Sequence, residues 1–241
     1  MRPFKRYEVW GIQSVNTMTG EGMMGIRKYI FHKFEKPTGV IGKIAGRYMA
    51  VENKSLNKWT ASLLDIRDGD KLVEVGYGPG KGIEYICRAY QNVSLTGYDI
   101  SADMKELAES RNSDYIKERR VTLYSRSVAE ASEQPETFDK AYSVNSILIW
   151  KDPVNDLRVI KEWLKPNGQI AITLQPHEKG ATDETAEENG KVISLYLKQA
   201  GFQNITVHTK EMKPVNAVTV TANKKIENSN NNVLKNFNRV H

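Results

Sequence analysis

Residues 71–82, KLVEVGYGPGKG, constrain the fold more than any other part of this chain. An apolar run that predicts a buried strand is interrupted by Glu74 and is followed by glycine at every second position. Glycine lacks a Cβ, so its backbone can adopt positive φ and can approach a ligand closely. A strand, a glycine-rich turn and a helix at the carboxyl edge of a parallel sheet are typical of a nucleotide-like cofactor site in α/β proteins.

The spacing of the glycines separates two kinds of cofactor site. A dinucleotide site needs G-x-G-x-x-G, yet the third glycine position falls on Lys81 when the count starts at Gly76, and on Ile83 when it starts at Gly78. The pattern is instead E-x-G-x-G-x-G, with Glu74 two residues before the first glycine. That carboxylate would repel a pyrophosphate but suits a cofactor with a cationic amine. The loop therefore predicts a nucleoside site without phosphates.

These residues resemble the class I S-adenosylmethionine-dependent methyltransferases, particularly the ubiquinone/menaquinone-biosynthesis-like branch. The resemblance runs over about residues 37–224. In that family the glycine loop wraps the methionine end of the cofactor, which implies that Gly76, Tyr77 and Gly78 lie against it. The resemblance also implies that Glu74 supports the cofactor's amino group, directly or through water. The alternative is a glycine-rich turn that only joins a strand to a helix.

A second β-rich run, residues 94–99, ends in an acid. Asp99 lies 23 positions after Gly76, which allows one helix and a return to the adjacent parallel strand. An acid at this offset can accept hydrogen bonds from both ribose hydroxyls, and the resemblance then places Ile100 beside the adenine. The alternative role for Asp99 is a helix N-cap, although Ser101 could be the cap instead.

The third predicted strand, residues 121–125, leads to Ser127 and Val128. The family that this chain resembles usually has an acid at the position of Ser127, and that acid holds the adenine amino group. A serine can also accept a hydrogen bond, but it does so more weakly and has a shorter reach. The backbone N–H of Val128 could serve the ring instead, and Ser127 could equally be an ordinary loop serine. This departure from the family pattern leaves the adenine contact open.

The fourth predicted strand, residues 138–146, ends where similar proteins face the transferring methyl group. Asn145 and Ser146 are therefore candidate contacts, and Asn145 counts both as a cofactor contact and as a weak catalytic candidate. Trp150 is either a wall of the acceptor pocket or, as we favour, an aromatic side chain packed under a loop. The chain lacks the N/D-P-P-Y sequence of many amine-methylating families, which argues against planar amines of nucleic-acid bases. His177 is the best candidate base, with an exposed loop histidine as the alternative.

The remaining pattern completes an α/β fold. We expect helices over about 154–164 and 187–200, a turn at 165–168, and strands at 169–174, 204–209 and 217–222. The last two strands are close enough for a hairpin, and an antiparallel last strand is what the methyltransferase sheet has. The sequence therefore predicts a Rossmann-like, seven-stranded, mostly parallel sheet with an antiparallel last strand, helices on both faces and an N-terminal helical lid.

Charge and composition divide the chain into four segments: a basic extension (1–36), a helical lid segment (37–66), an S-adenosylmethionine-binding domain (67–224) and a disordered tail (225–241). The net charge is +6, but residues 1–36 carry seven Lys and Arg against three acids, and residues 224–241 carry four against one. The basic excess thus lies in the tails, and we do not expect nucleic-acid binding by the domain. In the lid segment Leu56, Trp59, Leu63 and Leu64 recur on one helix face, and Tyr48 is a third weak catalytic candidate.

The cysteine, the apolar stretches and the histidines bear on the cellular compartment, on a membrane span and on metal binding. The one cysteine, Cys87, excludes an intramolecular disulfide and fits a reducing cytoplasm, and we expect it to be a packed core thiol. No apolar stretch approaches the roughly 18–20 residues that span a bilayer. The four histidines form no cluster with metal-ligand spacing. We therefore expect a cytoplasmic enzyme without a metal or a membrane span.

The sequence thus predicts a methyltransferase that uses S-adenosylmethionine on a small-molecule acceptor. The identity of the acceptor, the choice among O-, N-, C- and S-methylation, and the oligomeric state stay open. An NAD-type Rossmann oxidoreductase is the alternative enzyme, which the glycine spacing and the terminal hairpin disfavour. The alternative without catalysis is an S-adenosylmethionine-binding regulatory protein.

Overall fold

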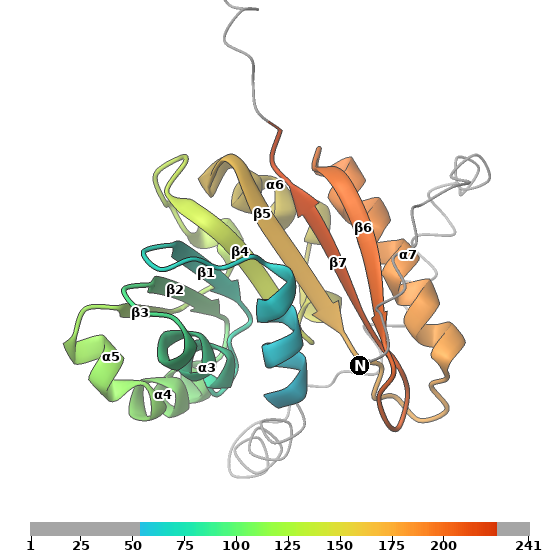
Figure 1. The fold of residues 1–241 in the computed structure, drawn as a ribbon, viewed down its shortest axis with the longest axis horizontal. Helices are drawn as coiled ribbons and strands as arrows, with labels where there is room; N and C mark the ends of the chain where they lie inside the picture. The colour runs from blue at the N-terminus through green and yellow to red at the C-terminus, as the bar shows by residue number, and fades with distance from the viewer. Residues whose placement is uncertain (1–53, 226–241) are drawn as a thin grey trace, which may run out of the picture.

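The computed structural model describes residues 54–225, which form a sheet of seven strands in the order β3-β2-β1-β4-β5-β7-β6 (Figure 1). Strands β1 to β5 pair in parallel, and β7 is antiparallel to both of its neighbours. The predicted sheet and its terminal hairpin are therefore confirmed. The strands are β1 (Lys71–Val75), β2 (Ser94–Asp99), β3 (Val121–Ser125), β4 (Phe138–Val144), β5 (Leu164–Leu174), β6 (Gln203–Lys210) and β7 (Ala217–Asn223).

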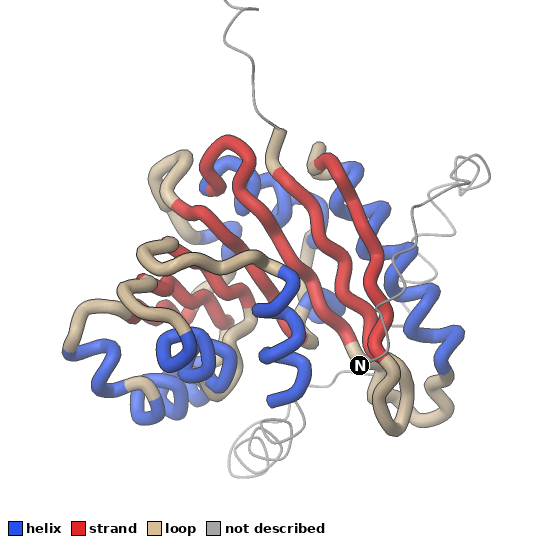
Figure 2. The backbone as a smooth tube through the Cα atoms, viewed as in Figure 1, coloured by secondary structure: helices blue, strands red, loops and turns tan. Residues whose placement is uncertain are grey.

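Helices cover both faces of the sheet (Figures 1 and 2). One face carries a helix over residues 54–63 together with α3 (Lys81–Ala89), α4 (Ala102–Arg111) and α5 (Ser113–Lys117), and the other carries α6 (Pro153–Trp163) and α7 (Asp183–Gln199). Each face has its own cluster of buried apolar side chains, as expected for parallel strands that are covered on both sides. Two short 3-10 turns, η2 (Val128–Glu130) and η3 (Ile147–Ile149), follow β3 and β4.

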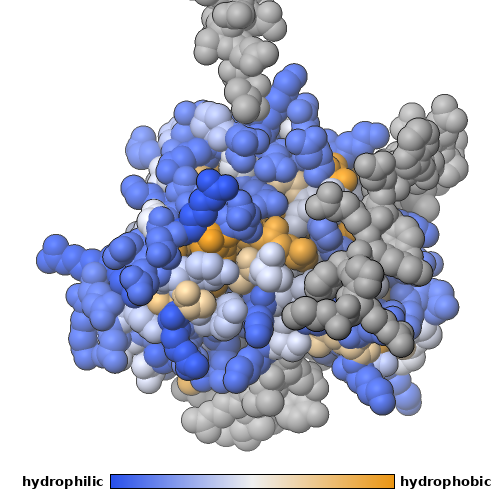
Figure 3. All heavy atoms as spheres, in the orientation of Figure 1, coloured by the Kyte–Doolittle hydropathy of each residue, from blue (hydrophilic) through white to orange (hydrophobic). Residues whose placement is uncertain are grey.

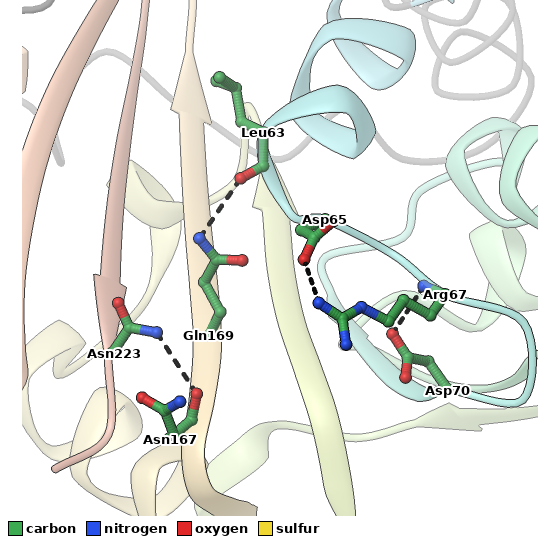
Figure 4. A network of polar contacts seen from close by, with 7 residues as sticks. All are labelled: Leu63, Asp65, Arg67, Asp70, Asn167, Gln169 and Asn223. Atoms are coloured by element: carbon green, nitrogen blue, oxygen red, sulfur yellow. Dashed lines mark hydrogen bonds and ion pairs between the residues drawn. The ribbon is translucent and has the colours of Figure 1, made fainter.

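The helix over residues 54–63 belongs to the core. Leu56 and Trp59 are buried, and the Thr60 hydroxyl lies 2.6 Å from that of Thr173 in β5. At its end, the Gln169 side chain donates to the Leu63 carbonyl at 3.4 Å (Figure 4). The described end of the predicted lid segment is thus fixed to the sheet.

The other segments that we predicted around the domain lie outside the described residues. These are the basic extension, the first part of the lid segment with Tyr48, and the tail beyond Lys225. The assignment of a lid and of separate tail segments therefore stays a prediction.

Two element boundaries differ from the sequence-based expectation by more than two residues. Strand β5 begins at Leu164, before the turn expected at 165–168, because a register shift lets Leu164 pair with Phe138 and Gln169 pair with Lys140. The backbone does turn within this stretch, where Asn167 has a φ of 63°. Helix α7 begins at Asp183 rather than near 187, with Thr182 as its N-cap.

The strand order creates the site. From β1 the chain moves outward to β2 and β3 and then returns to β4 on the other side of β1. In open α/β sheets, ligands bind at the carboxyl ends of the strands where the order reverses. The register places Val75 opposite Tyr98 and Glu74 opposite Tyr142, so the ends of β1, β2 and β4 meet at one edge. The glycine loop and Asn145 both lie there.

The surface and the helices differ in how much apolar character they show. Figure 3 shows a mostly hydrophilic face with apolar atoms exposed near its middle. Of the helices in residues 54–225, none has the length and apolar character that a membrane crossing requires.

Candidate active site

The glycine loop has left-handed backbone at alternate positions, with φ of 75° at Gly76, 51° at Gly78 and 75° at Gly80. A Cβ at Gly76 would overlap the Ser146 side chain, whereas a Cβ at Gly78 would meet no atom within 4 Å. Gly76 is therefore required by packing as well as by its positive φ. Gly78 instead leaves a bare stretch of backbone that faces open space.

The loop is held from behind by the end of α4. The Arg111 guanidinium donates to the Pro79 carbonyl, and the buried Asn112 amide donates to the Gly80 carbonyl at 3.1 Å. A Cβ on Gly80 would lie 2.6 Å from the Asn112 Nδ2. Neither residue could be predicted from the sequence, because nothing local marks a helix end 32 residues away as the support of this loop.

Asp99 joins β2 to the glycine loop. Its Oδ2 accepts a hydrogen bond from the Gly78 N–H at 2.9 Å and its Oδ1 one from the Ser101 N–H at 2.9 Å. Ser101, whose hydroxyl accepts from the Met104 N–H, is the N-cap of α4, so the alternative that Asp99 is the cap is wrong. Burial raises the pKa of the Asp99 carboxyl, and the backbone hydrogen bonds offset part of that rise.

Tyr77 turns its ring under the loop. The side chain is buried, its hydroxyl donates to the Tyr124 carbonyl at 3.1 Å, and its ring fills the space that a Cβ on Gly97 would need. Only the backbone of Tyr77 is left for a ligand. The expected position of Tyr77 against a cofactor therefore concerns its main chain, because the ring is part of the core.

Glu74 also points inward. The side chain is 3% exposed, and its Oε2 accepts a hydrogen bond from the Tyr142 hydroxyl at 2.7 Å. Its Oε1 lies so close to Gly82, in the first turn of α3, that a Cβ there would be 2.7 Å away. Burial raises the pKa of the Glu74 carboxyl to about 8, although the Tyr142 hydrogen bond lowers it. The loop motif predicts the acid at position 74, but no local signal in the sequence indicates its partner Tyr142.

The predicted adenine side combines exposed and buried groups. Ile100, directly after Asp99, is 56% exposed. Ser127 is the N-cap of η2, and its N–H donates to the Glu130 carboxylate at 3.1 Å. The Val128 side chain is buried in the core, which leaves only its backbone for a ligand. The adenine contacts of these residues stay predictions.

The structure brings Asn145 and His177 together. Asn145 has a φ of 55°, and its Oδ1 accepts from the Gln175 N–H at 2.8 Å. A backbone N–H can only donate, so this contact fixes the oxygen and turns the Asn145 Nδ2 toward the His177 Nε2, 3.4 Å away. The pair lies at the carboxyl ends of β4 and β5 and presents an amide and an exposed imidazole.

Ser146 and Trp150 belong to the packing around this edge. The Ser146 hydroxyl donates to the Val75 carbonyl at 2.9 Å and lies 2.6 Å from the Ser143 hydroxyl. The same Ser146 hydroxyl accepts a hydrogen bond from the Trp150 indole N–H at 3.1 Å. Trp150 is buried in the apolar core, so the prediction of an aromatic packed under a loop is confirmed. Ser146 ties the end of β1 to that of β4 instead of reaching outward.

Two remaining expectations concern reactive groups. Cys87 is a free, buried thiol, as predicted for a core residue, and burial raises its pKa to about 11. Within residues 54–225, no group of three or more His, Cys, Asp or Glu side chains is arranged to hold a metal ion.

Comparison with known proteins decides the family. The model of a methyltransferase domain matches residues 72–168, which include the glycine loop, Asp99 and Asn145. Methyltransferase YdaC of Bacillus subtilis (strain 168) is 38% identical over 181 residues, which are 75% of this chain and 98% of YdaC. The chain belongs to the class I S-adenosylmethionine-dependent methyltransferases. The methyltransferase uses S-adenosylmethionine as its cofactor, and the alternative of an NAD-type oxidoreductase falls away.

More distant proteins agree with this family. Phosphoethanolamine N-methyltransferase 1 of Triticum aestivum is 27% identical over 188 residues, which are 77% of this methyltransferase but only 36% of the wheat protein. An S-adenosylmethionine-dependent methyltransferase from Aquifex aeolicus shares the fold with a TM-score of 0.58 at 16% identity, over 73% of this chain and 98% of that one. This methyltransferase thus spans about a third of the wheat enzyme and shares the fold of the Aquifex enzyme.

The residues at the carboxyl edge of the methyltransferase fit this cofactor. Gly78 offers bare backbone beside open space, where a bulkier residue would fill the place of a ligand. The Asp99 oxygens accept backbone hydrogen bonds from Gly78 and Ser101, and a carboxylate has about four lone-pair sites, so it can still accept from a hydroxyl group. Ile100 adds an exposed apolar surface next to them. These three features match a polar sugar flanked by a flat apolar ring.

Proposed function

We propose that this methyltransferase acts on a small-molecule acceptor that binds at the carboxyl ends of β4 and β5. The contact between Asn145 and His177 carries the proposal. The two residues are 32 positions apart in the chain, and both lie at the sheet edge that also holds the glycine loop. An acceptor bound against them would lie next to the cofactor's methionine end.

In this proposal the half of the site that binds the cofactor, at the ends of β1 and β2, contacts it through backbone groups and a carboxylate. The backbone at Gly76, Tyr77 and Gly78 lies along the methionine portion, and Asp99 accepts hydrogen bonds from the ribose hydroxyls. The cofactor's sulfonium supplies the methyl group and most of the driving force. The protein's task is then to hold the acceptor atom close and in line with the methyl group.

A second group of residues binds the adenine end of the cofactor in this proposal. Ile100 packs against the ring, and Ser127 or the Val128 N–H contacts the ring's polar edge. The observation that supports this is the large exposed fraction of Ile100 beside Asp99, because an exposed apolar side chain at a sheet edge gains from a flat apolar partner.

The Asn145–His177 pair gives the acceptor side its chemistry. An acceptor hydroxyl or protonated amine must lose a proton before or during attack, and His177 takes that proton at its Nε2 once the acceptor's O–H or N–H replaces the Asn145 amide as the hydrogen-bond donor to that nitrogen. Asn145 acts as a positioning residue, because the Gln175 N–H fixes its amide and the amide in turn orients the imidazole. Oxygen and nitrogen acceptors both fit this arrangement.

Named relatives support a small acceptor. The wheat protein is a phosphoethanolamine N-methyltransferase, and a relative from Amycolatopsis mediterranei (strain S699), 28% identical over 157 residues, is a 27-O-demethylrifamycin SV methyltransferase. Both names describe small molecules, one methylated on nitrogen and one on oxygen. We propose the same acceptor class here, with the quinone-biosynthesis branch still a prediction. The free thiol of Cys87 supports a reducing compartment such as the cytoplasm.

Two experiments test the proposal in sequence. S-adenosylhomocysteine at about 100 times its dissociation constant should add about 2.7 kcal/mol to the free energy of unfolding, measured on protein freed of copurified cofactor. Methyl-labelled S-adenosylmethionine should then transfer label to at least one acceptor in a panel of small phenols, alcohols and amines, and His177→Gln should slow that transfer. Cofactor binding without transfer to any acceptor, including intact protein and RNA, would favour the regulatory alternative. Transfer to a macromolecule alone would refute the small-acceptor proposal.

A further inference from the structure

Ile149 is a large apolar side chain that the fold leaves at the surface. Among residues 54–225, the large hydrophobic residues with exposed side chains are Ile100, at 56%, and Ile149, at 46%. Ile100 directly follows β2, and Ile149 lies in η3, just after β4. Because β2 and β4 are the two neighbours of β1, these two isoleucines flank the edge of the sheet where the glycine loop begins.

The apolar residues around Ile149 are anchored in the core. Ile147 and Trp150 are buried, and Leu148 is half-buried and packs against the same core cluster. The turn itself is closed by hydrogen bonds from the Ile149 N–H to the Ser146 carbonyl at 3.0 Å and from the Trp150 N–H to the Ile147 carbonyl at 3.3 Å. An ordered turn therefore presents the Ile149 side chain to solvent.

Ser146 ties this turn to the start of the glycine loop. Its hydroxyl donates to the Val75 carbonyl at 2.9 Å, and Val75 directly precedes Gly76. A Cβ on Gly76 would lie 2.3 Å from the Ser146 side chain, so the turn and the loop touch at this point. Ile149 is thus held beside the first residue of the loop, on the β4 side, where Asn145 also lies.

This location gives the acceptor side an apolar group next to a polar one. The Asn145 amide and the His177 imidazole provide hydrogen-bonding groups at the ends of β4 and β5. Hydrocarbon that covers Ile149 removes apolar surface from water, which is favourable. A wholly polar acceptor would lose part of its own hydration against Ile149 without a hydrogen bond in return.

We propose that Ile149 is a specificity-determining residue that selects acceptors with an alkyl or aryl group next to the reacting oxygen or nitrogen. This inference rests on the proposed function, because it needs an acceptor bound at the ends of β4 and β5. The acceptor class is then an amphipathic alcohol, phenol or amine. Ile149 acts through apolar contact with the acceptor and takes no part in proton transfer.

Methyl transfer to two homologous series tests the proposal with the full chain. The series are primary amines from ethylamine to hexylamine, and phenols from 4-methylphenol to 4-pentylphenol. In wild-type protein, kcat/KM should rise by about twofold to fourfold for each added CH2 in at least one series, because complete burial of one CH2 contributes about 0.8 kcal/mol. In Ile149→Ser the rise should flatten, and the loss should lie in the KM of the longer acceptors.

A matched change on the other exposed isoleucine is the control. Ile100→Ser should raise the KM of S-adenosylmethionine and keep the dependence on acceptor chain length, since Ile100 lies on the adenine side. Ile149→Thr and Ile149→Val keep the test decisive if Ile149→Ser does not fold. Threonine and valine have nearly the same shape and differ in one hydroxyl group, so the threonine variant should show the flatter rise.

The possible outcomes separate this inference from the proposed function. An equal rise in wild type and in the Ile149 variants would overturn the role of Ile149. Transfer to ethanolamine and other polar acceptors without any dependence on chain length would also overturn it, while the proposed function would stand. Transfer to none of the small molecules would refute the proposed function, and this inference with it.

Discussion

The two halves of the active site are built in different ways. In the proposed cofactor half, at the ends of β1 and β2, the glycine loop offers its backbone, and the buried side chains of Tyr77 and Asn112 hold the loop from behind. In the proposed acceptor half, at the ends of β4 and β5, the side chains of Asn145 and His177 meet and are the functional groups that we propose. The fold fixes the position of a backbone surface. Side chains at the edge of the sheet, in contrast, can be substituted without disturbing the fold.

This difference predicts how substitutions act. A change in the cofactor half alters the packing of the sheet and the binding of the cofactor together, because the same atoms serve both. A change in the acceptor half alters the chemistry with little effect on the fold, since His177 is exposed. The following variants probe that contrast, in order of their expected effect on folding or binding free energy.

Gly76→Ala should cause the largest loss of stability. Left-handed backbone costs a residue with a Cβ about 1–2 kcal/mol, and the overlap with Ser146 adds about 1–3 kcal/mol of overpacking. Urea unfolding measures the sum. Gly69→Ala is the matched control, because Gly69 has a φ of 89° but open space around its Cβ position. Equal losses in the two variants would mean that Ser146 does not constrain the loop.

Glu74 should make stability depend on pH. The carboxyl has a pKa of about 8 in the folded protein, against a usual value of 4.5, so the folded state holds this proton more tightly than the unfolded state. The stabilisation from this proton is complete below pH 4.5 and is lost as the pH rises toward 8, by at most about 1.4 kcal/mol per unit. Urea unfolding of wild type and Glu74→Gln across this range measures it. Parallel curves for the two proteins would show that Glu74 ionises normally.

Asp99→Ala should weaken S-adenosylhomocysteine binding by about 2 kcal/mol, because two hydrogen bonds to a charged group are lost. Calorimetric titration at fixed pH measures the change. Asp114→Ala, an exposed acid in α5, should bind like wild type. If Asp99→Ala binds S-adenosylhomocysteine as tightly as wild type, Asp99 only links Gly78 to Ser101 and does not contact the cofactor.

Asn145→Gly should cost about 1 kcal/mol of stability, since the hydrogen bond from the Gln175 N–H is lost while glycine tolerates the φ of 55°. Asn145→Ala should cost more, because alanine also meets the left-handed strain. Thermal unfolding compares the two variants. Methyl transfer should fall further in both than this loss of stability explains, since the His177 imidazole loses its orienting partner. Wild-type transfer rates in Asn145→Gly would refute the positioning role.

His177→Gln should have the smallest effect on stability, within about 0.5 kcal/mol, as for other exposed positions. We expect cofactor affinity to stay at the wild-type level while the rate of methyl transfer falls by about 10²–10⁴-fold for an acceptor that must lose a proton. His208→Gln in β6 is the matched histidine control. If both histidine variants transfer methyl groups at the wild-type rate, the acceptor half needs no base from this loop.

The sequence determined the parts of the site that are local. The strand, glycine loop and helix around Gly76 follow one another directly, and Asp99 ends the next strand, so periodicity and spacing alone located them. The same local signals gave the seven strands and the terminal hairpin. They misplaced the starts of β5 and α7, because a register shift and a capping residue several positions upstream decided those boundaries.

Only the tertiary structure decided which side chains meet and which way they point. Tyr77 and Glu74 both belong to the most informative motif, yet packing turns one under Gly97 and the other onto Tyr142. Asn145 and His177 come together because β4 and β5 are neighbours that end at one edge. Sequence spacing sets local backbone geometry, whereas contacts between distant residues depend on strand order and on the competition of side chains for the same buried volume.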